Sequence, residues 1–168
     1  MRASELTTSA TIRRAATPAD MDEARALFRE YADWLAVDLC FQGFAEELAT
    51  LPGAYAPPRG CLLLAGPAGA AFGCVALRPL TEPDAPEGAV GEVKRLYVRP
   101  AARGQGQGER LVEAIVAAAR GAGYRELKLD TLLHMVDARR LYERLGFGPC
   151  SPYYHNPLPG AVYLSRTL

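Results

Sequence analysis

The sequence predicts a single α/β domain with a central, mostly antiparallel sheet and helices on both faces. Three observations support this fold class. The chain of 168 residues fits one ordinary domain, and its hydrophobic fraction of 49% is enough to build a core. Apolar runs of strand length alternate with segments whose apolar residues recur every three or four positions. We expect one domain over residues 1–168, with residues 1–10 as a flexible N-terminal extension.

The first third of the chain predicts one strand followed by two helices. The strand is expected over Thr11–Ala15. The sequence Thr-Pro-Ala-Asp at 17–20 is typical of a helix start, with a capping threonine, a proline at the first helical position and an aspartate in the first turn. A helix of about five turns is expected from the apolar stripe that follows. A second, short helix is expected between Asp38 and Thr50, before Leu-Pro-Gly at 51–53 ends it.

The remainder predicts six strands and two helices. The strands are expected at Cys61–Ala65, Ala71–Leu80, Val90–Arg99, Glu126–Thr131, Pro149–Tyr154 and Ala161–Leu168. One helix has an apolar face over 111–119 and ends at Gly-Ala-Gly, residues 121–123. The other has its apolar face over 138–145 and ends at Gly146. The expected order is therefore strand, two helices, three strands, helix, strand, helix and two strands.

Composition argues against several classes of function. The 19 basic and 19 acidic side chains cancel, so a nucleic-acid partner is not expected. No apolar run approaches the roughly 20 residues that cross a bilayer, and the N-terminus lacks an apolar signal core. We therefore expect a cytoplasmic protein without a membrane segment. The four cysteines form no CxxC pair, so we expect reduced thiols and no metal site.

A glycine-rich turn lies between a predicted strand and a predicted helix. It consists of Arg103, Gly104, Gln105, Gly106, Gln107 and Gly108. Such a turn exposes main-chain N–H groups beside the positive end of the helix, which suits a pyrophosphate. A Walker loop is not indicated, because Glu109 and Arg110 follow where lysine and serine or threonine are needed. The GxGxG spacing also differs from the dinucleotide GxGxxG. A coenzyme A loop and a flexible connector remain as alternatives.

Two motifs decide between them by resemblance. EVKRLYVRP at 92–100, followed by RGQGQG at 103–108, resembles the acetyl-CoA motif of the GNAT superfamily, in which Arg103, Gly106 and Gly108 fill Arg/Gln-x-x-Gly-x-Gly/Ala. The pattern Ala138-x-x-Leu141-Tyr142-x-x-x-Gly146-Phe147 looks like the family's second signature. The resemblance spans residues 11–168. It implies an N-acetyltransferase that moves the acetyl group of acetyl-CoA to a primary amine, with the sheet splayed between its fourth and fifth strands.

The resemblance also implies where acetyl-CoA binds. In the family, a bulge separates the strand corresponding to 90–99 from the strand at 126–131, and the pantetheine arm lies in the gap. Many members carry an asparagine where this chain has Met135, and the alternatives for its contact are Thr131, His134 or a backbone group. The implied cofactor-binding residues are Leu96, Tyr97, Val98, all six residues of the glycine turn, Thr131 and Arg139.

Two side chains are candidates for proton transfer. Glu92 matches the position of a family general base, and strand alternation, subject to the bulge, puts it on one face with Lys94, Leu96 and Val98. The alternative is an exposed glutamate paired with Lys94 or Arg95. Tyr142 matches the family tyrosine that protonates the leaving thiolate; the alternative is a core tyrosine.

In the family, the early helices and the loop between the last strands shape the acceptor pocket. Here these segments are Asp38–Glu47 and Tyr153–Asn156. Acidic side chains there would attract an ammonium group, and aromatic ones would pack on it; His155 is an alternative base. The candidates are Asp38, Phe41, Tyr154 and His155, with Glu46, Glu47 and Tyr153 beside them. A homodimer is compatible with the resemblance. The rival functions are a non-catalytic acyl-CoA-binding module and a nucleotide-phosphate binder.

Overall fold

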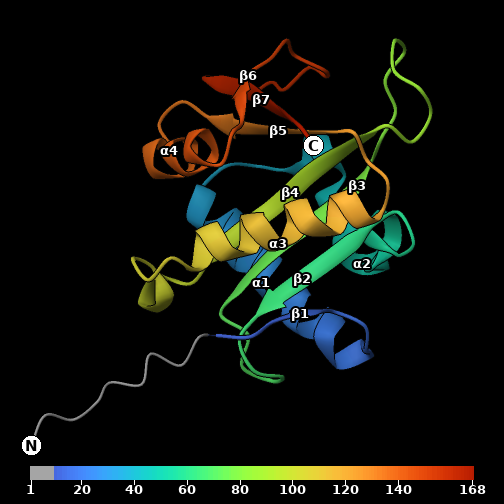
Figure 1. Cartoon of the computed structure of the whole chain (residues 1–168). Helices are drawn as coiled ribbons and strands as arrows, with labels where there is room; N and C mark the ends of the chain where they lie inside the picture. The colour runs from blue at the N-terminus through green and yellow to red at the C-terminus, as the bar shows by residue number, and fades with distance from the viewer. Residues whose placement is uncertain (1–9) are drawn as a thin grey trace, which may run out of the picture.

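The computed structural model describes residues 10–168, so the expected extension over 1–10 lies outside the described residues except for residue 10. The elements follow the predicted order (Figure 1). The helices are α1 (Pro18–Leu35), α2 (Phe44–Thr50), α3 (Gln107–Gly121) and α4 (Val136–Arg144). The strands are β1 (Ile12–Arg14), β2 (Cys61–Ala65), β3 (Gly73–Leu80), β4 (Val90–Val98), β5 (Glu126–Leu132), β6 (Gly148–Pro149) and β7 (Ala161–Thr167).

The strands form one sheet in the order β1-β2-β3-β4-β5-β7-β6. All neighbours are antiparallel except β4 and β5. These two pair only over Val90–Glu92 and Glu126–Lys128, so their later residues are not joined to each other. The predicted mostly antiparallel sheet, splayed between its fourth and fifth strands, is confirmed.

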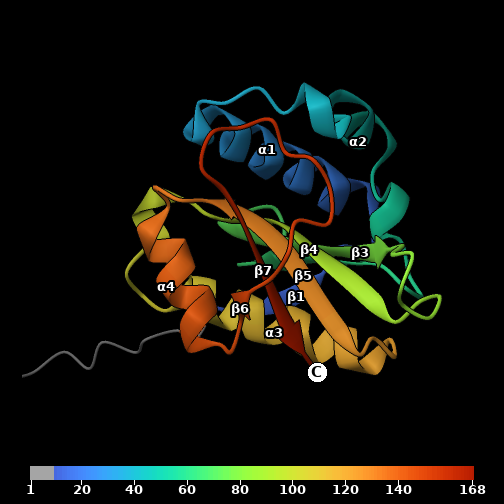
Figure 2. The ribbon, with the colours of Figure 1, turned by 90° about the horizontal axis from the view of Figure 1, so that it is seen from above.

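Helices cover both faces of this sheet, as predicted (Figure 2). On one face, α3 buries Leu111, Val112 and Ile115 in the larger of two apolar cores. On the other, α1 buries Leu27 and Phe28 in the second core. The start of α1 is a capping box, in which the Thr17 side chain accepts from the Asp20 N–H and Asp20 accepts from the Thr17 N–H. Local capping and periodicity therefore agree with the tertiary packing.

A β-bulge in β4 changes which side chains share a face. The β3–β4 register shifts between Cys74 and Ala76, and Arg95 has a φ of 60°, in the left-handed region. Consecutive residues Lys94 and Arg95 both reach toward the α1–α2 side, where they contact Gln42 and Glu47. Beyond the bulge the alternation is inverted, so that Leu96 and Val98 pack with the α3 core. The expectation that Leu96 and Val98 share a face with Glu92 and Lys94 was therefore wrong.

The predicted strand Pro149–Tyr154 was also wrong. Gly148 and Pro149 pair with β7, the Cys150 N–H donates to the Tyr163 carbonyl at 3.0 Å, and residues 151–160 form a loop that crosses the sheet toward α1 (Figure 2). The physical reason is that Tyr153 and Tyr154 use their hydroxyls to bind carboxylates of β4 and β5. These side-chain contacts draw the backbone out of the ladder.

Candidate functional site

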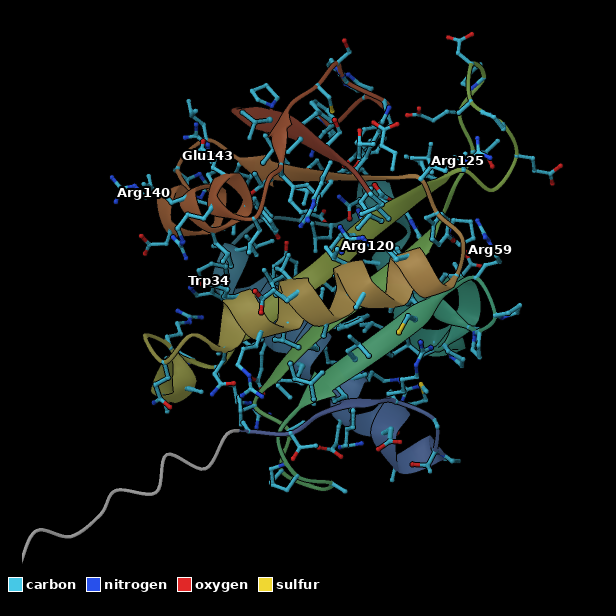
Figure 3. All side chains as sticks on the ribbon, in the orientation of Figure 1. Trp34, Arg59, Arg120, Arg125, Arg140 and Glu143 are labelled. Carbon is cyan, nitrogen blue, oxygen red and sulfur yellow. The ribbon has the colours of Figure 1, made fainter. Side chains whose placement is uncertain are left out.

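A cavity of about 590 Å³ runs along the gap between β4 and β5. One end is formed by the glycine turn, the start of α3 and α4. The other end is formed by the C-terminal part of α1, the turn of 3₁₀ helix at Cys40–Gln42 and the loop 151–160. Figure 3 labels Trp34 and Arg140, two of the lining residues, at the end of the molecule where α3 begins. The cavity thus joins a main-chain turn to a cluster of polar side chains.

The glycine turn has the conformation that an anion site requires. Gly104 and Gly106 have φ values of 75° and 74°, which residues with a side chain rarely adopt. Gly106 precedes the first residue of α3, and no side chain caps this helix. Within the described part of the chain, the N–H groups of residues 104–109 donate to no main-chain carbonyl. Free amides and the positive helix end therefore meet at the cavity.

Arg103 packs against the end of β4 and against α1. Its Nε donates to the Val98 carbonyl at 2.8 Å, and its guanidinium carbon lies 4.8 Å from the Trp34 ring centroid and 5.7 Å from that of Tyr97. These contacts orient an exposed cation beside the turn. Trp34 lines the cavity and is 47% exposed. Trp34 was not among the predicted site residues, because its position next to the helical stripe carries no motif.

The structure brings most of the predicted cofactor-binding residues to the cavity wall. Gln105 and Arg139 are not among the residues that line it. Arg139 instead donates to the Leu133 carbonyl at 3.1 Å, while the next residue, Arg140, faces the cavity. Met135 also lines the cavity, and its Sδ is 3.6 Å from the Thr131 hydroxyl. Those that do line it are Leu96, Tyr97, Val98, Arg103, Gly104, Gly106, Gln107, Gly108 and Thr131.

Tyr142 lies on α4 with its ring packed edge-on against Phe147, at 5.7 Å between centroids. It lines the cavity although it is only 7% exposed. Its hydroxyl has no hydrogen-bond partner among residues 10–168. Burial raises the pKa of Tyr142, so the hydroxyl stays protonated at neutral pH and is available as a donor. The residue is thus both a core tyrosine and a cavity residue.

Glu92 is held in a buried ion pair away from the cavity wall. It is 1% exposed and is not among the lining residues. Its Oε1 accepts from the Arg78 Nε at 2.7 Å, and its Oε2 accepts from the Tyr153 hydroxyl at 2.7 Å. The alternative of an exposed glutamate is therefore wrong. Its role as a base stays a prediction. Both of its oxygens already accept hydrogen bonds, so the amine would have to displace Arg78 or Tyr153 to reach one.

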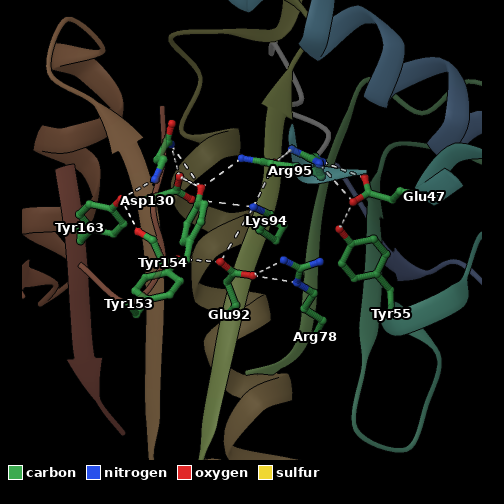
Figure 4. Close-up of polar contacts among 12 residues, drawn as sticks. Glu47, Tyr55, Arg78, Glu92, Lys94, Arg95, Asp130, Tyr153, Tyr154 and Tyr163 are labelled. Atoms are coloured by element: carbon green, nitrogen blue, oxygen red, sulfur yellow. Dashed lines mark hydrogen bonds and ion pairs between the residues drawn. The ribbon is translucent and has the colours of Figure 1, made fainter. Parts of the chain in front are cut away.

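A second carboxylate, Asp130 on β5, lines the cavity itself. Its Oδ2 accepts from the Tyr154 hydroxyl and from Asn156 Nδ2, the latter at 2.8 Å (Figure 4). The buried Lys94 ammonium lies 3.8 Å from its Oδ1. Burial lowers the pKa of Lys94, although Glu92 and Asp130 act in the opposite direction. Charged residues within otherwise buried strands were the signal that could have identified this pair.

Arg95 anchors the bulge through its side chain. Its Nε and Nη2 donate to the Glu47 carboxylate at 2.8 and 3.1 Å, and its Nη1 donates to Gln42 Oε1 at 2.9 Å (Figure 4). Tyr55 donates to the same carboxylate at 2.8 Å. Glu47, predicted as an attractor of the acceptor amine, instead neutralises Arg95.

The predicted acceptor segments reach the cavity, but through neighbouring residues. Asp38 accepts from the Cys40 N–H at 2.8 Å, and neither it nor Phe41 nor His155 lines the cavity. Tyr154 acts indirectly, through its hydroxyl contacts with Asp130 and, at 3.2 Å, with Gln42. The residues of these segments that do line the wall are Leu39, Gln42 and Asn156, and Leu158 lines it just beyond the second segment.

The described residues offer neither a membrane-spanning helix nor a cluster of metal ligands. Within residues 10–168, no helix combines the length and apolar character that crossing a membrane requires. In the same range, no three histidine, cysteine, aspartate or glutamate side chains are grouped to hold a metal ion.

Comparisons with known proteins agree with the geometry. Residues 17–147 match the model of the acetyltransferase (GNAT) family. An uncharacterized N-acetyltransferase of Schizosaccharomyces pombe is 42% identical over 148 residues, which cover 88% of each chain. A proposed acyl-CoA N-acyltransferase of Klebsiella pneumoniae is 32% identical, with a TM-score of 0.71 over 95% of this chain and 98% of that one. A proposed acetyltransferase of Salmonella typhimurium, solved with its cofactor acetyl-CoA, shares the fold at 19% identity (TM-score 0.71, covering 94% and 93%).

Proposed function

Because the chain belongs to the acetyltransferase (GNAT) family and is an acetyl-CoA-dependent N-acyltransferase, we propose that it acetylates a primary amine of a small molecule or peptide. The amine attacks acetyl-CoA directly while both are bound. One observation carries the proposal: a single cavity connects the free amides of the glycine turn to the buried Lys94 and Asp130.

The glycine turn is the proposed site for the pyrophosphate of acetyl-CoA. Its unpaired N–H groups and the start of α3 offer donors and positive potential to an anion. Arg103 and Arg140 add cationic side chains on the cavity wall. The Salmonella relative, whose structure includes acetyl-CoA, supports this choice of donor.

The pantetheine arm is proposed to follow the gap between β4 and β5. The two strands are unpaired with each other beyond Glu92 and Lys128, so main-chain groups near Leu96 and Val98 are available to a ligand. A main-chain N–H near Leu96 or Tyr97 would polarise the thioester carbonyl. Removing one such donor costs about 3 kcal/mol in other acyl-transfer sites.

The reaction needs one proton acceptor and one proton donor. The amine arrives protonated, since its ordinary pKa is about 10. We assign its proton to Asp130, directly or through water, because Asp130 lines the cavity whereas Glu92 does not. The amine nitrogen then bonds to the carbonyl carbon, the carbon–sulfur bond breaks, and the thiolate takes the Tyr142 proton. The second proton, which the nitrogen loses as the amide forms, restores the Tyr142 hydroxyl through water. Glu92 and His155 stay as alternative bases.

Two experiments test the proposal in order. A thermal-shift panel should show protection by acetyl-CoA and coenzyme A, and none by ATP or NAD; a ligand at 100 times its dissociation constant adds about 2.7 kcal/mol of stability. A free-thiol assay with acetyl-CoA and a panel of amines, amino acids, peptides and aminoglycosides should then show turnover with at least one acceptor. Protection without any turnover would contradict the proposed reaction.

A further inference from the structure

Lys94 is a buried cation on the cavity wall that uses only part of its hydrogen-bonding capacity. Its side chain is 4% exposed, and its Nζ donates to Gln42 Oε1 at 3.1 Å. The nearest carboxylate oxygens, those of Asp130 and Glu92, lie at 3.8 and 3.9 Å, beyond hydrogen-bonding distance. An ammonium group carries three donors. Two of the Lys94 donors therefore have no partner among residues 10–168.

Asp130 has one carboxylate oxygen that accepts no hydrogen bond from the described residues. Its Oδ2 accepts two hydrogen bonds, from Tyr154 and Asn156. Its Oδ1 accepts none from the described residues and faces Lys94 Nζ across 3.8 Å. Buried polar groups are normally paired, so free donors and a free acceptor on one cavity wall point to a polar ligand.

Neighbouring residues hold this pair apart. Gln42 binds Lys94 through its Oε1, and its Nε2 donates at 3.2 Å to the Tyr154 hydroxyl, which in turn binds Asp130 (Figure 4). The other charges of the network are in direct contact, as Arg78–Glu92 and Arg95–Glu47. Within the described network, the Lys94–Asp130 pair is thus the one whose cation keeps unused donors and whose carboxylate keeps an oxygen without a hydrogen bond.

We infer that the Lys94–Asp130 pair binds the two charged groups of a free α-amino acid, which is the acceptor. The carboxylate takes the free donors of Lys94, and the amine lies against Asp130 Oδ1. The inference rests on the proposed acetyl transfer and names the substrate class of that same site. Charge-assisted hydrogen bonds of this kind are stronger than neutral ones.

The rest of the wall at this end favours an apolar side chain on that amino acid. It is formed by Leu35, Leu39 and Leu158. An amino acid such as leucine satisfies the charged pair and places its hydrocarbon against these residues. Its amine then delivers one proton to Asp130 Oδ1 before attacking the thioester carbon, as in the reaction above.

Three acceptors that differ only at the carboxylate test the inference. Release of coenzyme A by the full chain is measured with leucine, with leucinamide and with 3-methylbutylamine, which is leucine without its carboxylate. We expect kcat/KM for leucine to exceed that for 3-methylbutylamine by about hundredfold, with leucinamide between them. Lys94→Met should reduce the ratio of kcat/KM for leucine to kcat/KM for 3-methylbutylamine from about a hundred to about one.

Lys128→Met is the matched control. Lys128 also projects from a central strand, but its Nζ binds Glu82 at 2.7 Å and it does not line the cavity. This variant should keep the wild-type preference for leucine. Protection by acetyl-CoA in a thermal shift verifies that each variant is folded, and if Lys94→Met is not, the wild-type ratio of leucine to 3-methylbutylamine decides alone.

The outcomes separate this inference from the proposed function. If the wild type acetylates 3-methylbutylamine as well as leucine, the inference falls while acetyl transfer to amines stands. If folded Lys94→Met loses activity equally toward both acceptors, Lys94 has a structural role and the inference also falls. If no amine, with or without a carboxylate, releases coenzyme A, both proposals fall together.

Discussion

The two ends of the cavity are built in different ways. At the end proposed for acetyl-CoA, the donor end, most of the ligand-binding groups are main-chain amides of one continuous segment, residues 104–109, whose conformation depends on Gly104 and Gly106. At the acceptor end, the polar groups are side chains from four separate segments, represented by Gln42, Lys94, Asp130 and Tyr154. A main-chain site is encoded locally and can be recognised from a motif, whereas a side-chain site depends on register and on loop placement. Disrupting each end should therefore have different consequences.

The largest effect is expected from Asp130→Asn at the acceptor end. The change keeps the shape of the side chain but removes the proposed base, so kcat/KM for the amine should fall by about 100- to 10,000-fold. The dissociation constant for acetyl-CoA, measured by calorimetry, should stay within about threefold.

Glu92→Gln is the comparison for that variant. Both glutamate oxygens are already engaged by Arg78 and Tyr153, so we expect a smaller loss of kcat than with Asp130→Asn. If Glu92→Gln, still folded, reduces kcat more than Asp130→Asn does, the base is Glu92 and our assignment of Asp130 is wrong.

A large loss of stability is expected from Arg95→Ala. It leaves the Glu47 carboxylate, whose side chain is 11% exposed, without its cation. The φ of 60° strains alanine as much as arginine, so the loss reports on the ion pair. We expect about 3–5 kcal/mol less free energy of unfolding, measured by urea denaturation. A loss under about 1 kcal/mol would show that the ion pair does not hold the bulge.

Tyr142→Phe tests the middle of the cavity, where the thioester of acetyl-CoA is proposed to meet the acceptor amine. The proposed acid is lost while the ring contact with Phe147 remains. We expect kcat to fall by about hundredfold, with little change in the KM for acetyl-CoA. Unchanged kcat in steady-state assays would leave Tyr142 as a packing residue only.

The smallest effect is expected at the donor end, from Gly106→Ala. A Cβ there meets nothing within 4 Å, but the φ of 74° costs a residue with a side chain about 1–2 kcal/mol. The turn should relax and misdirect its amides, so the KM for acetyl-CoA should rise by about tenfold or less while kcat changes little.

Gly121→Ala is the matched control at the other end of α3. It also has open space around a Cβ, but a helical conformation, so it should leave the KM for acetyl-CoA unchanged and stabilise the helix by up to about 1 kcal/mol. An equal rise in KM in both variants would show that the turn itself is not the binding element.

Local signals in the amino-acid order were sufficient for most of the fold and for the donor end. The Thr17–Asp20 capping box, the helical stripes and the glycine turn each occupy a short, continuous segment, and the structure has them where they were expected. Their physical basis is local: hydrogen bonds within one turn and the backbone preferences of glycine. The glycine turn at 103–108 is therefore both a family motif and a structure that its own residues determine.

The acceptor end was decided only by the tertiary structure. A single left-handed residue, Arg95, inverts the alternation of β4, and an ion pair between Arg95 and Glu47 of α2 accompanies it. The segment after Pro149 leaves the sheet because Tyr153 and Tyr154 bind carboxylates far away in sequence. Which carboxylate is covered and which one faces the cavity depends on these long-range contacts, since strand propensity and residue spacing are the same in either arrangement.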